Sequence, residues 1–225
     1  MPEAARSAPL QGRLRLHLVT DSALCGARGV EAVVCAAVQG GASCVQLREK
    51  TLATRAFVER ARALKALLAP LGVPLVVNDR LDVALACGAD GVHVGQGDMP
   101  AAEVRRWLPH AIVGLSIESA AQLRQAEEDP SVDYYGVSPV FATPTKTDTA
   151  PALGLDGLRA LRAMTRRPLV AIGGIHAGNA ALVMDAGADG LAVVGALCTA
   201  DDPAEAARRL REIVDDRVQW RSQNP

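Results

Sequence analysis

Three stretches of this sequence repeat one design and decide its fold: GGASCVQL at residues 40–47, CGADGVHVG at residues 87–95 and AGADGLAVVG at residues 186–195. In each, a glycine stands where a helix is expected to end, a short turn follows, and an apolar run begins. Glycine after a helix readily adopts the left-handed conformation that ends it. The three stretches therefore predict structural turns that lead from a helix into a strand.

Outward from these turns, short apolar runs alternate with helical stretches rich in Ala, Leu and Arg. The expected strands are residues 14–19, 43–47, 74–77, 91–94, 112–115, 134–137, 169–172 and 190–194. The expected helices are residues 29–39, 54–68, 81–87, 100–108, 120–127, 155–164, 177–186 and 203–214. Strands that alternate with helices indicate a parallel sheet. Eight such units in 225 residues favour a closed α/β barrel, the (β/α)8 TIM barrel, over an open doubly wound sheet.

The composition agrees with one such domain. Hydrophobic residues make up 49% of the chain, but it has only two Trp, two Tyr and two Phe, so Ala, Val, Leu and Ile must form the core. We expect the catalytic barrel over residues 14–215, between a flexible N-terminal extension at 1–13 and a C-terminal tail at 216–225.

Charge and cysteine content exclude several functions. The net charge of −1 gives no basic excess for nucleic acid or an acidic membrane surface. The five cysteines form no C-x-x-C pair, which favours reduced thiols over a disulfide framework. No signal peptide and no apolar run of ~18 residues is evident. These features predict a cytoplasmic protein that acts on small molecules.

The residues that follow each strand are the candidates for chemistry, because barrel active sites lie at the C-terminal ends of the strands. QLREK at residues 46–50 follows the second strand, and alternation places Gln46, Arg48 and Lys50 on one face. Two cations and an amide suit a diphosphate ligand. A solvated charge cluster is the alternative interpretation.

Two aspartates end adjacent strands. Asn78 and Asp79 follow the third strand, and Asp98 follows the fourth. Mg²⁺ prefers a few carboxylates together with phosphate and water oxygens, so this pair predicts a magnesium site. Alternatively, each aspartate caps the helix that follows it.

Hydroxyl groups and glycines follow the later strands. Ser116 and the loop residues Thr143, Thr145 and Lys146 offer donors that suit phosphate. Glycines after the seventh and eighth strands, including Gly174 and Gly195, suit a monophosphate bound by backbone N–H groups. His93, within a strand, and His176, at the start of a helix, are interpreted as structural.

With these residues in view, the chain closely resembles the thiamine phosphate synthase family. The resemblance runs from about residue 16 to residue 197 and rests on LHLVTD, QLREK, VVNDRLDVALACGADGVHVGQGD, TPTK and AIGGI. It implies an enzyme, a transferase, that joins hydroxymethylpyrimidine diphosphate to thiazole (carboxy)phosphate and releases diphosphate by a Mg²⁺-dependent dissociative substitution. It also implies a homo-oligomer, although only by analogy with the family.

The resemblance assigns roles to individual residues. The pyrimidine diphosphate would contact Gln46, Leu47, Arg48, Glu49, Lys50, Asn78, Ser116 and Lys146. The thiazole phosphate would contact Thr143, Pro144, Thr145, Gly174, Val194 and Gly195. Mg²⁺ would be held by Asp79 and Asp98, and the catalytic residues would be Arg48, Lys50, Ser116 and Lys146.

The sequence departs from the family pattern at two positions. Gly195 stands where the family often has Ser, and His17 stands where it often has Tyr. Two other functions remain open at this point: a thiazole tautomerase of the same superfamily, and a non-catalytic barrel that binds thiazole phosphate. Neither explains the complete set of diphosphate-facing residues.

Overall fold

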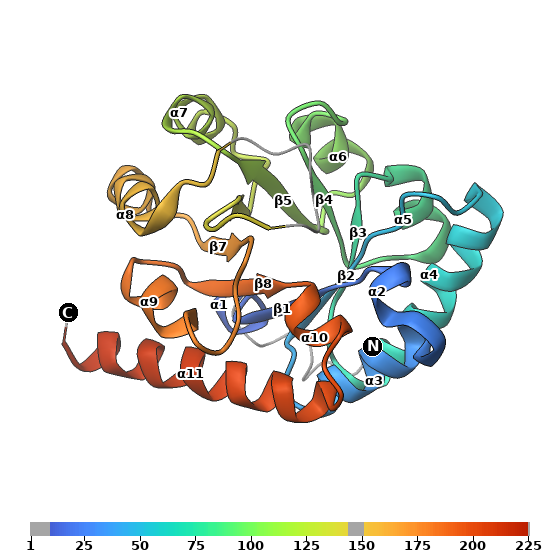
Figure 1. Ribbon diagram of the computed structural model, residues 1–225. Coiled ribbons are helices and arrows are strands. Elements are labelled where there is room, and N and C mark those ends of the chain that lie inside the picture. Colours follow the sequence, from blue (N-terminus) through green and yellow to red (C-terminus); the bar gives the residue numbers. More distant parts are fainter. Residues whose placement is uncertain (1–9, 144–150, 225) are drawn as a thin grey trace.

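The computed structural model describes residues 10–143 and 151–224. Eight parallel strands close into a barrel in chain order, with β8 paired to β1 (Figure 1). The strands are β1 (Leu16–Val19), β2 (Cys44–Leu47), β3 (Leu75–Asn78), β4 (Gly91–Val94), β5 (Ile112–Ile117), β6 (Tyr134–Val137), β7 (Leu169–Ile172) and β8 (Gly190–Val193). The predicted (β/α)8 barrel is thus confirmed, and each predicted strand is present within two residues of its expected bounds.

Helices surround this barrel (Figure 1). The longer ones are α3 (Val30–Gln39), α4 (Thr54–Leu68), α5 (Leu81–Cys87), α6 (Ala101–Trp107), α7 (Ala120–Glu127), α8 (Gly154–Met164), α9 (Ala180–Asp185) and α11 (Pro203–Gln223). Five short turns of helix were not predicted: α1 (Leu10–Arg13), α2 (Ser22–Cys25), η2 (Gly26–Arg28), η3 (Ala69–Leu71) and α10 (Gly195–Cys198).

The last helix is longer than predicted. We expected it to end at residue 214, but α11 continues to Gln223, so residues 216–223 are helical rather than a separate tail. Its sequence contains no glycine, and no proline after Pro203, that would stop it. Arg221 donates to the carbonyl of Ala188 at 2.7 Å, which fastens the final turn to the barrel.

Two apolar layers build the core. The larger one lies between the strands and the helices, and a smaller cluster fills the barrel from Leu14, Val19, Ile112, Tyr134, Val170 and Ala192. Leu10, on α1, packs against this inner cluster, and in the view of Figure 1 α1 appears inside the outer ring of helices, behind β1 and β8. Part of the extension predicted to be flexible thus packs against the barrel interior.

A polar connection repeats at the N-terminal ends of the strands, which form the base of the barrel. The residue before each even-numbered strand accepts a hydrogen bond from a backbone N–H near the start of the preceding odd-numbered strand. The pairs are Leu16 N–H to Ser43 at 2.9 Å, Leu75 to Asp90 at 2.9 Å, Val113 to Asp133 at 2.8 Å and Leu169 to Asp189 at 2.8 Å.

Each of the three aspartates also meets a cation from the helix before the odd strand. The ion pairs are Lys65–Asp90 at 2.6 Å, Arg105–Asp133 at 2.7 Å and Arg162–Asp189 at 2.7 Å. Each carboxylate therefore joins a helix to two strands. Two of these aspartates, and Ser43, belong to the repeated stretches from which the fold was predicted, so those stretches are structural as expected.

Candidate active site

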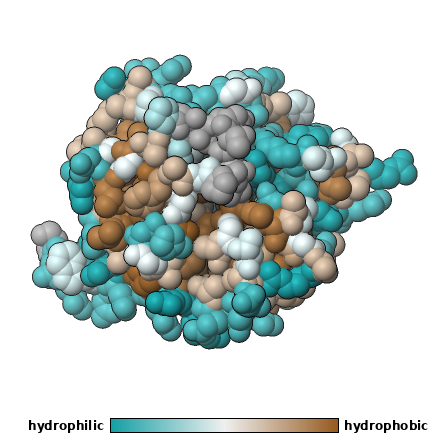
Figure 2. All heavy atoms as spheres, in the orientation of Figure 1, coloured by the Kyte–Doolittle hydropathy of each residue, from teal (hydrophilic) through white to brown (hydrophobic). Residues whose placement is uncertain are grey.

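A cavity of about 670 Å³ opens at the C-terminal ends of the strands. All eight strands or the loops that follow them contribute to its lining, and its polar side chains come mainly from β2 to β5. On β7, β8 and β1 the lining includes the apolar side chains of Val19, Val170 and Ile172. Figure 2 shows apolar residues around the middle of one face of the molecule and hydrophilic residues around its periphery.

The structure brings most of the predicted site residues to this cavity. Those that line it are Gln46, Arg48, Lys50, Asn78, Asp79, Asp98, Ser116, Thr143, Gly174, Val194 and Gly195. Pro144, Thr145 and Lys146 lie outside the described residues. Within the described chain, the predicted residues other than Leu47 and Glu49 are therefore gathered at one mouth of the barrel.

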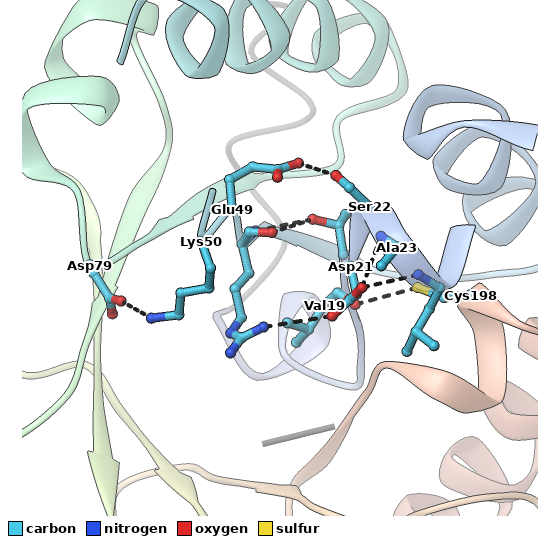
Figure 3. Close-up of polar contacts among 11 residues, drawn as sticks. Val19, Asp21, Ser22, Ala23, Glu49, Lys50, Asp79 and Cys198 are labelled. Atoms are coloured by element: carbon cyan, nitrogen blue, oxygen red, sulfur yellow. Dashed lines mark hydrogen bonds and ion pairs between the residues drawn. The ribbon is translucent and has the colours of Figure 1, made fainter. Parts of the chain in front are cut away.

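The two aspartates face one another across the rim. Burial raises the pKa of Asp98, and the neighbouring Asp79 carboxylate raises it further. Asp98 accepts the backbone N–H of Gly95 at 2.7 Å, and Asp79 accepts from Lys50 Nζ at 2.9 Å (Figure 3). Two close carboxylates repel one another, so this arrangement suits a cation between them.

Helix capping does not explain these aspartates. The N-caps of α5 and α6 are Arg80 and Pro100, and neither helix has a side-chain cap. Asp79 instead has a φ of 64°, the only positive φ among the described residues other than glycine. Residues other than glycine rarely adopt this backbone conformation. Backbone strain of this kind is concentrated at functional sites.

Arg48 and Lys50 reach the cavity by the predicted alternation. The backbone N–H of Arg48 donates to Thr20 Oγ1 at 3.0 Å, which fixes the chain at the end of β2. The Arg48 guanidinium lies 3.8 Å from the Asp21 carboxylate. Asp21 also accepts the N–H groups of Ala23 and Leu24 and so caps α2. The guanidinium therefore lies beside the Asp21 carboxylate at the side of the cavity.

Leu47 and Glu49 have side chains directed away from the cavity. Leu47 is buried in the outer core. Glu49 accepts from Ser22 Oγ at 2.6 Å and pairs with Arg60 at 2.6 Å, and Figure 3 shows it directed toward Ser22 while Lys50 is directed toward Asp79. Neither residue lines the cavity, so any contact with a ligand there would come from its backbone.

Ser116 belongs to a hydrogen-bonded chain inside the barrel. The two ring nitrogens of His93 lie 2.9 Å from Tyr134 Oη and 2.9 Å from Ser116 Oγ. Burial raises the pKa of Tyr134 well above its usual value, so its hydroxyl stays protonated. Ser116 is thus held in place by a neighbouring histidine, and His93, interpreted as structural, lies in the lining of the cavity.

The glycines after β7 and β8 differ in whether the local backbone requires a glycine. Gly174 has a φ of 62°, and a Cβ there would lie 2.8 Å from the carbonyl oxygen of Ala142. Gly195 begins α10 directly after Val194, and a Cβ there would meet nothing within 4 Å. The backbone requires glycine at residue 174 but not at residue 195.

Several polar residues that line the cavity were not predicted as site residues. Gln96 donates to the backbone carbonyl of Ser116 at 2.6 Å, and Glu118, Tyr134 and His17 are part of the lining. Alternation along β1 and β6 would have placed His17 and Tyr134 inside the barrel. Gln96 and Glu118 lie beyond strand ends, where their direction depends on the loops.

Comparisons with known proteins agree over nearly the whole barrel. A family model described as thiamine monophosphate synthase matches residues 16–197. The thiamine-phosphate synthase of Albidiferax ferrireducens is 62% identical over 203 residues, which are 90% of this chain and 92% of that protein. That of Chloroflexus aurantiacus is 54% identical over 200 residues, 89% of this chain and 92% of the relative.

A solved structure supports the same conclusion. The thiamine phosphate pyrophosphorylase from Pyrococcus furiosus superposes with a TM-score of 0.86 at 37% identity, covering 93% of this chain and all of that one. A closed barrel with a polar cavity at its C-terminal face defines a (β/α)8-barrel enzyme. Within that class, the chain belongs to the thiamine monophosphate synthase family.

Proposed function

We propose that this chain joins a hydroxymethylpyrimidine diphosphate to a thiazole phosphate, forming thiamine phosphate and diphosphate. The family match across the barrel carries this proposal. The arrangement of the cavity supports it, because cations and carboxylates stand at the ends of β2 to β4 while glycines stand at the ends of β7 and β8. The first group suits a diphosphate and the second a monophosphate.

We assign Mg²⁺ to Asp79 and Asp98. The proximity of the two carboxylates and the raised pKa of Asp98 fit a divalent cation. When bound, Mg²⁺ would neutralise charge on the leaving diphosphate. The described residues contain no group of three or more His, Cys, Asp or Glu side chains fit to hold a metal. A site with two carboxylates leaves positions for phosphate and water oxygens, as Mg²⁺ prefers.

The chain's own residues bind and orient the two substrates. Arg48 and Lys50 would bind the diphosphate, and their positive charge favours its departure from the methylene carbon. Ser116, fixed by His93, would donate to the pyrimidine or to the leaving group. Lys146 of the TPTK loop would add a further cation, as the family resemblance implies. Alignment of two bound substrates contributes several powers of ten in rate.

The expected dissociative path requires no nucleophile from the protein. The C–O bond to the diphosphate breaks first, and the aminopyrimidine shares the positive charge left on the methylene carbon. The thiazole nitrogen then attacks this carbon, so one C–O bond breaks and one C–N bond forms. The apolar wall around Val170 and Ile172 suits the two rings.

We further propose that the enzyme works in the cytoplasm as a homo-oligomer. All five cysteines lie in the described part of the chain and are free thiols, which supports a reducing compartment. Across residues 10–143 and 151–224, no helix has the length and apolar character needed to cross a bilayer.

The test is formation of thiamine phosphate from the two purified substrates, with Mg²⁺ and with a chelator. Product that requires Mg²⁺ is expected. A chain that binds thiazole phosphate but forms no product under either condition would instead be a tautomerase-like or non-catalytic barrel. Product formation that continues unchanged under chelation would refute the assignment of the metal to Asp79 and Asp98.

A further inference from the structure

One side chain at the base of the cavity has no use in the reaction described so far. His17 lies on β1 and pairs in register with Cys44 on β2 and Ala192 on β8. It is two residues before Val19, so it lies deeper in the barrel. The residue is fully buried, yet it is part of the cavity lining.

The imidazole of His17 lacks polar partners. Both ring nitrogens are buried and have no hydrogen-bond partner among the described residues. Its close ring neighbour is Tyr134, which it meets edge-on with ring centroids 5.6 Å apart. His93 lies beside the same tyrosine and has partners on both of its ring nitrogens. Buried polar atoms are almost always paired, so an unpaired ring beside a fully paired one needs a reason.

The imidazole of His17 is neutral at physiological pH. Burial, and secondarily the nearby His93, lower the pKa of His17 from 6.5 to about 3. A neutral imidazole offers one N–H donor and one nitrogen acceptor. His17 therefore suits an uncharged polar ligand group and not the phosphate ends of the substrates.

The surroundings of His17 favour a flat ring. Val19 and Val170 are apolar and line the cavity with it, and Ala192 beside it is small. Gln46, paired in register with Val19, places an amide one step above. An apolar slot with a few polar groups at its end is the usual way in which a protein selects a heterocycle.

We propose that His17 is a specificity-determining residue that hydrogen-bonds the polar edge of the substrate's aminopyrimidine ring, directly or through one water. An aminopyrimidine carries an exocyclic amine beside ring nitrogens, so its edge can both donate and accept. The thiazole ring offers no N–H, and its one nitrogen is consumed in the new bond. The inference rests on the proposed function, because that function supplies the pyrimidine.

The experiment compares His17→Phe and His17→Gln with the unaltered enzyme, measuring kcat and the KM of each substrate. Phe preserves the packing against Tyr134 but removes both nitrogens. We expect His17→Phe to raise the KM of the pyrimidine diphosphate about tenfold, the effect of one lost hydrogen bond, while the KM of thiazole phosphate stays unchanged. His17→Gln, which keeps a donor and an acceptor, should restore part of the loss.

A ligand series locates the contact. Calorimetric titration with the aminopyrimidine monophosphate and with its analogue lacking the amino group should show a smaller difference in Kd for His17→Phe than for the unaltered enzyme. Unchanged KM values, or a change confined to thiazole phosphate, would overturn the proposal. If the unaltered enzyme makes no thiamine phosphate, the proposed function fails, and the titration still tests His17.

Two controls separate recognition from folding. His110→Phe makes the same chemical change at an exposed position outside the cavity and should leave both KM values unchanged. Thermal melting of the ligand-free variants should show His17→Phe at least as stable as the unaltered protein, because it removes two unpaired buried polar atoms. If His17→Phe does not fold, His17→Gln and the ligand series carry the test.

Discussion

The ammonium of Lys50 lies 2.9 Å from Oδ2 of Asp79. The side chain of Lys50 is 53% exposed and that of Asp79 is 25% exposed, so the pair lies at the rim of the cavity, within reach of a ligand. Asp79 holds this place with a positive φ of 64°. The lysine thus compensates one of the two adjacent carboxylates that we assign to Mg²⁺.

Asp79→Asn should abolish most of the activity without unfolding the protein. The change keeps the size of the side chain but removes one of two carboxylates assigned to Mg²⁺. We expect kcat/KM to fall about a hundredfold to a thousandfold, a typical loss when one electrostatic group is removed from a reacting centre. Asp82→Asn is the matched control, because Asp82 pairs with Arg80 outside the cavity lining. Equal activity of the two variants would contradict the metal assignment.

Lys50→Gln should weaken the pyrimidine diphosphate specifically. A hydrogen bond to a charged group contributes about 1.5–3 kcal/mol, so we expect its KM to rise about tenfold or more. The dependence on Mg²⁺ should persist, because both aspartates remain. Arg159→Gln, which removes an exposed cation paired with Asp156, should leave the KM unchanged. A rise in the KM of thiazole phosphate alone would mean that Lys50 contacts that substrate and not the pyrimidine diphosphate.

Gly195→Ser should be tolerated and should improve binding of thiazole phosphate. A Cβ at this position meets nothing within 4 Å, so the larger residue fits without rearrangement. Its hydroxyl would add a donor beside the backbone N–H groups at the start of α10. We expect the KM of thiazole phosphate to fall about threefold to tenfold, as for one added hydrogen bond. Gly174→Ser is the contrasting variant, because its positive φ and the contact with Ala142 predict loss of binding.

The free energy of unfolding should decrease as the pH is lowered, over a pH range set by His17. The folded state holds this imidazole with a pKa of about 3, whereas 6.5 is its usual value, so between these values the unfolded chain binds more protons. The contribution to stability is complete above about pH 6.5 and is lost as the pH falls, by about 2 kcal/mol at pH 5. Urea unfolding at pH 7 and pH 5 should show a smaller loss for His17→Phe. An equal loss in both proteins would mean that His17 titrates normally.

The base of the barrel should carry stability and not activity. Asp133→Ala removes a partner of Arg105 and leaves the buried N–H of Val113 without its acceptor. We expect the free energy of unfolding to drop by about 1–3 kcal/mol, while kcat at 25 °C stays near normal. Asp156→Ala breaks an exposed pair with Arg159 and should change stability by less than about 0.5 kcal/mol.

Much of this fold could be predicted from local pattern, because each strand is a short apolar run between recognisable turns. Strands such as β4 and β6 agree with the predicted bounds. The four-residue helices α2 and α10 could not be predicted, since one turn is too short to show a period. The length of α11 was underestimated because its last turns are polar and are fixed by tertiary contacts such as that of Arg221.

Some features of the candidate site could likewise be predicted from the sequence, and others could not. Alternation along β2 correctly places Arg48 and Lys50 in the cavity, and the same rule sends Glu49 outward, although the family resemblance had included it. The positive φ of Asp79 and the missing partners of His17 depend on the surrounding three-dimensional structure. No periodicity in the sequence encodes them.

The four serine and aspartate connections at the base recur once for every two strands, so the barrel behaves as four linked quarters. In each quarter, one backbone N–H donates a hydrogen bond to one Ser or Asp side chain and so connects two strands at the end opposite the cavity. The loops at the cavity carry none of these connections. Changes in the rim loops can therefore alter the substrate without removing any of these four connections.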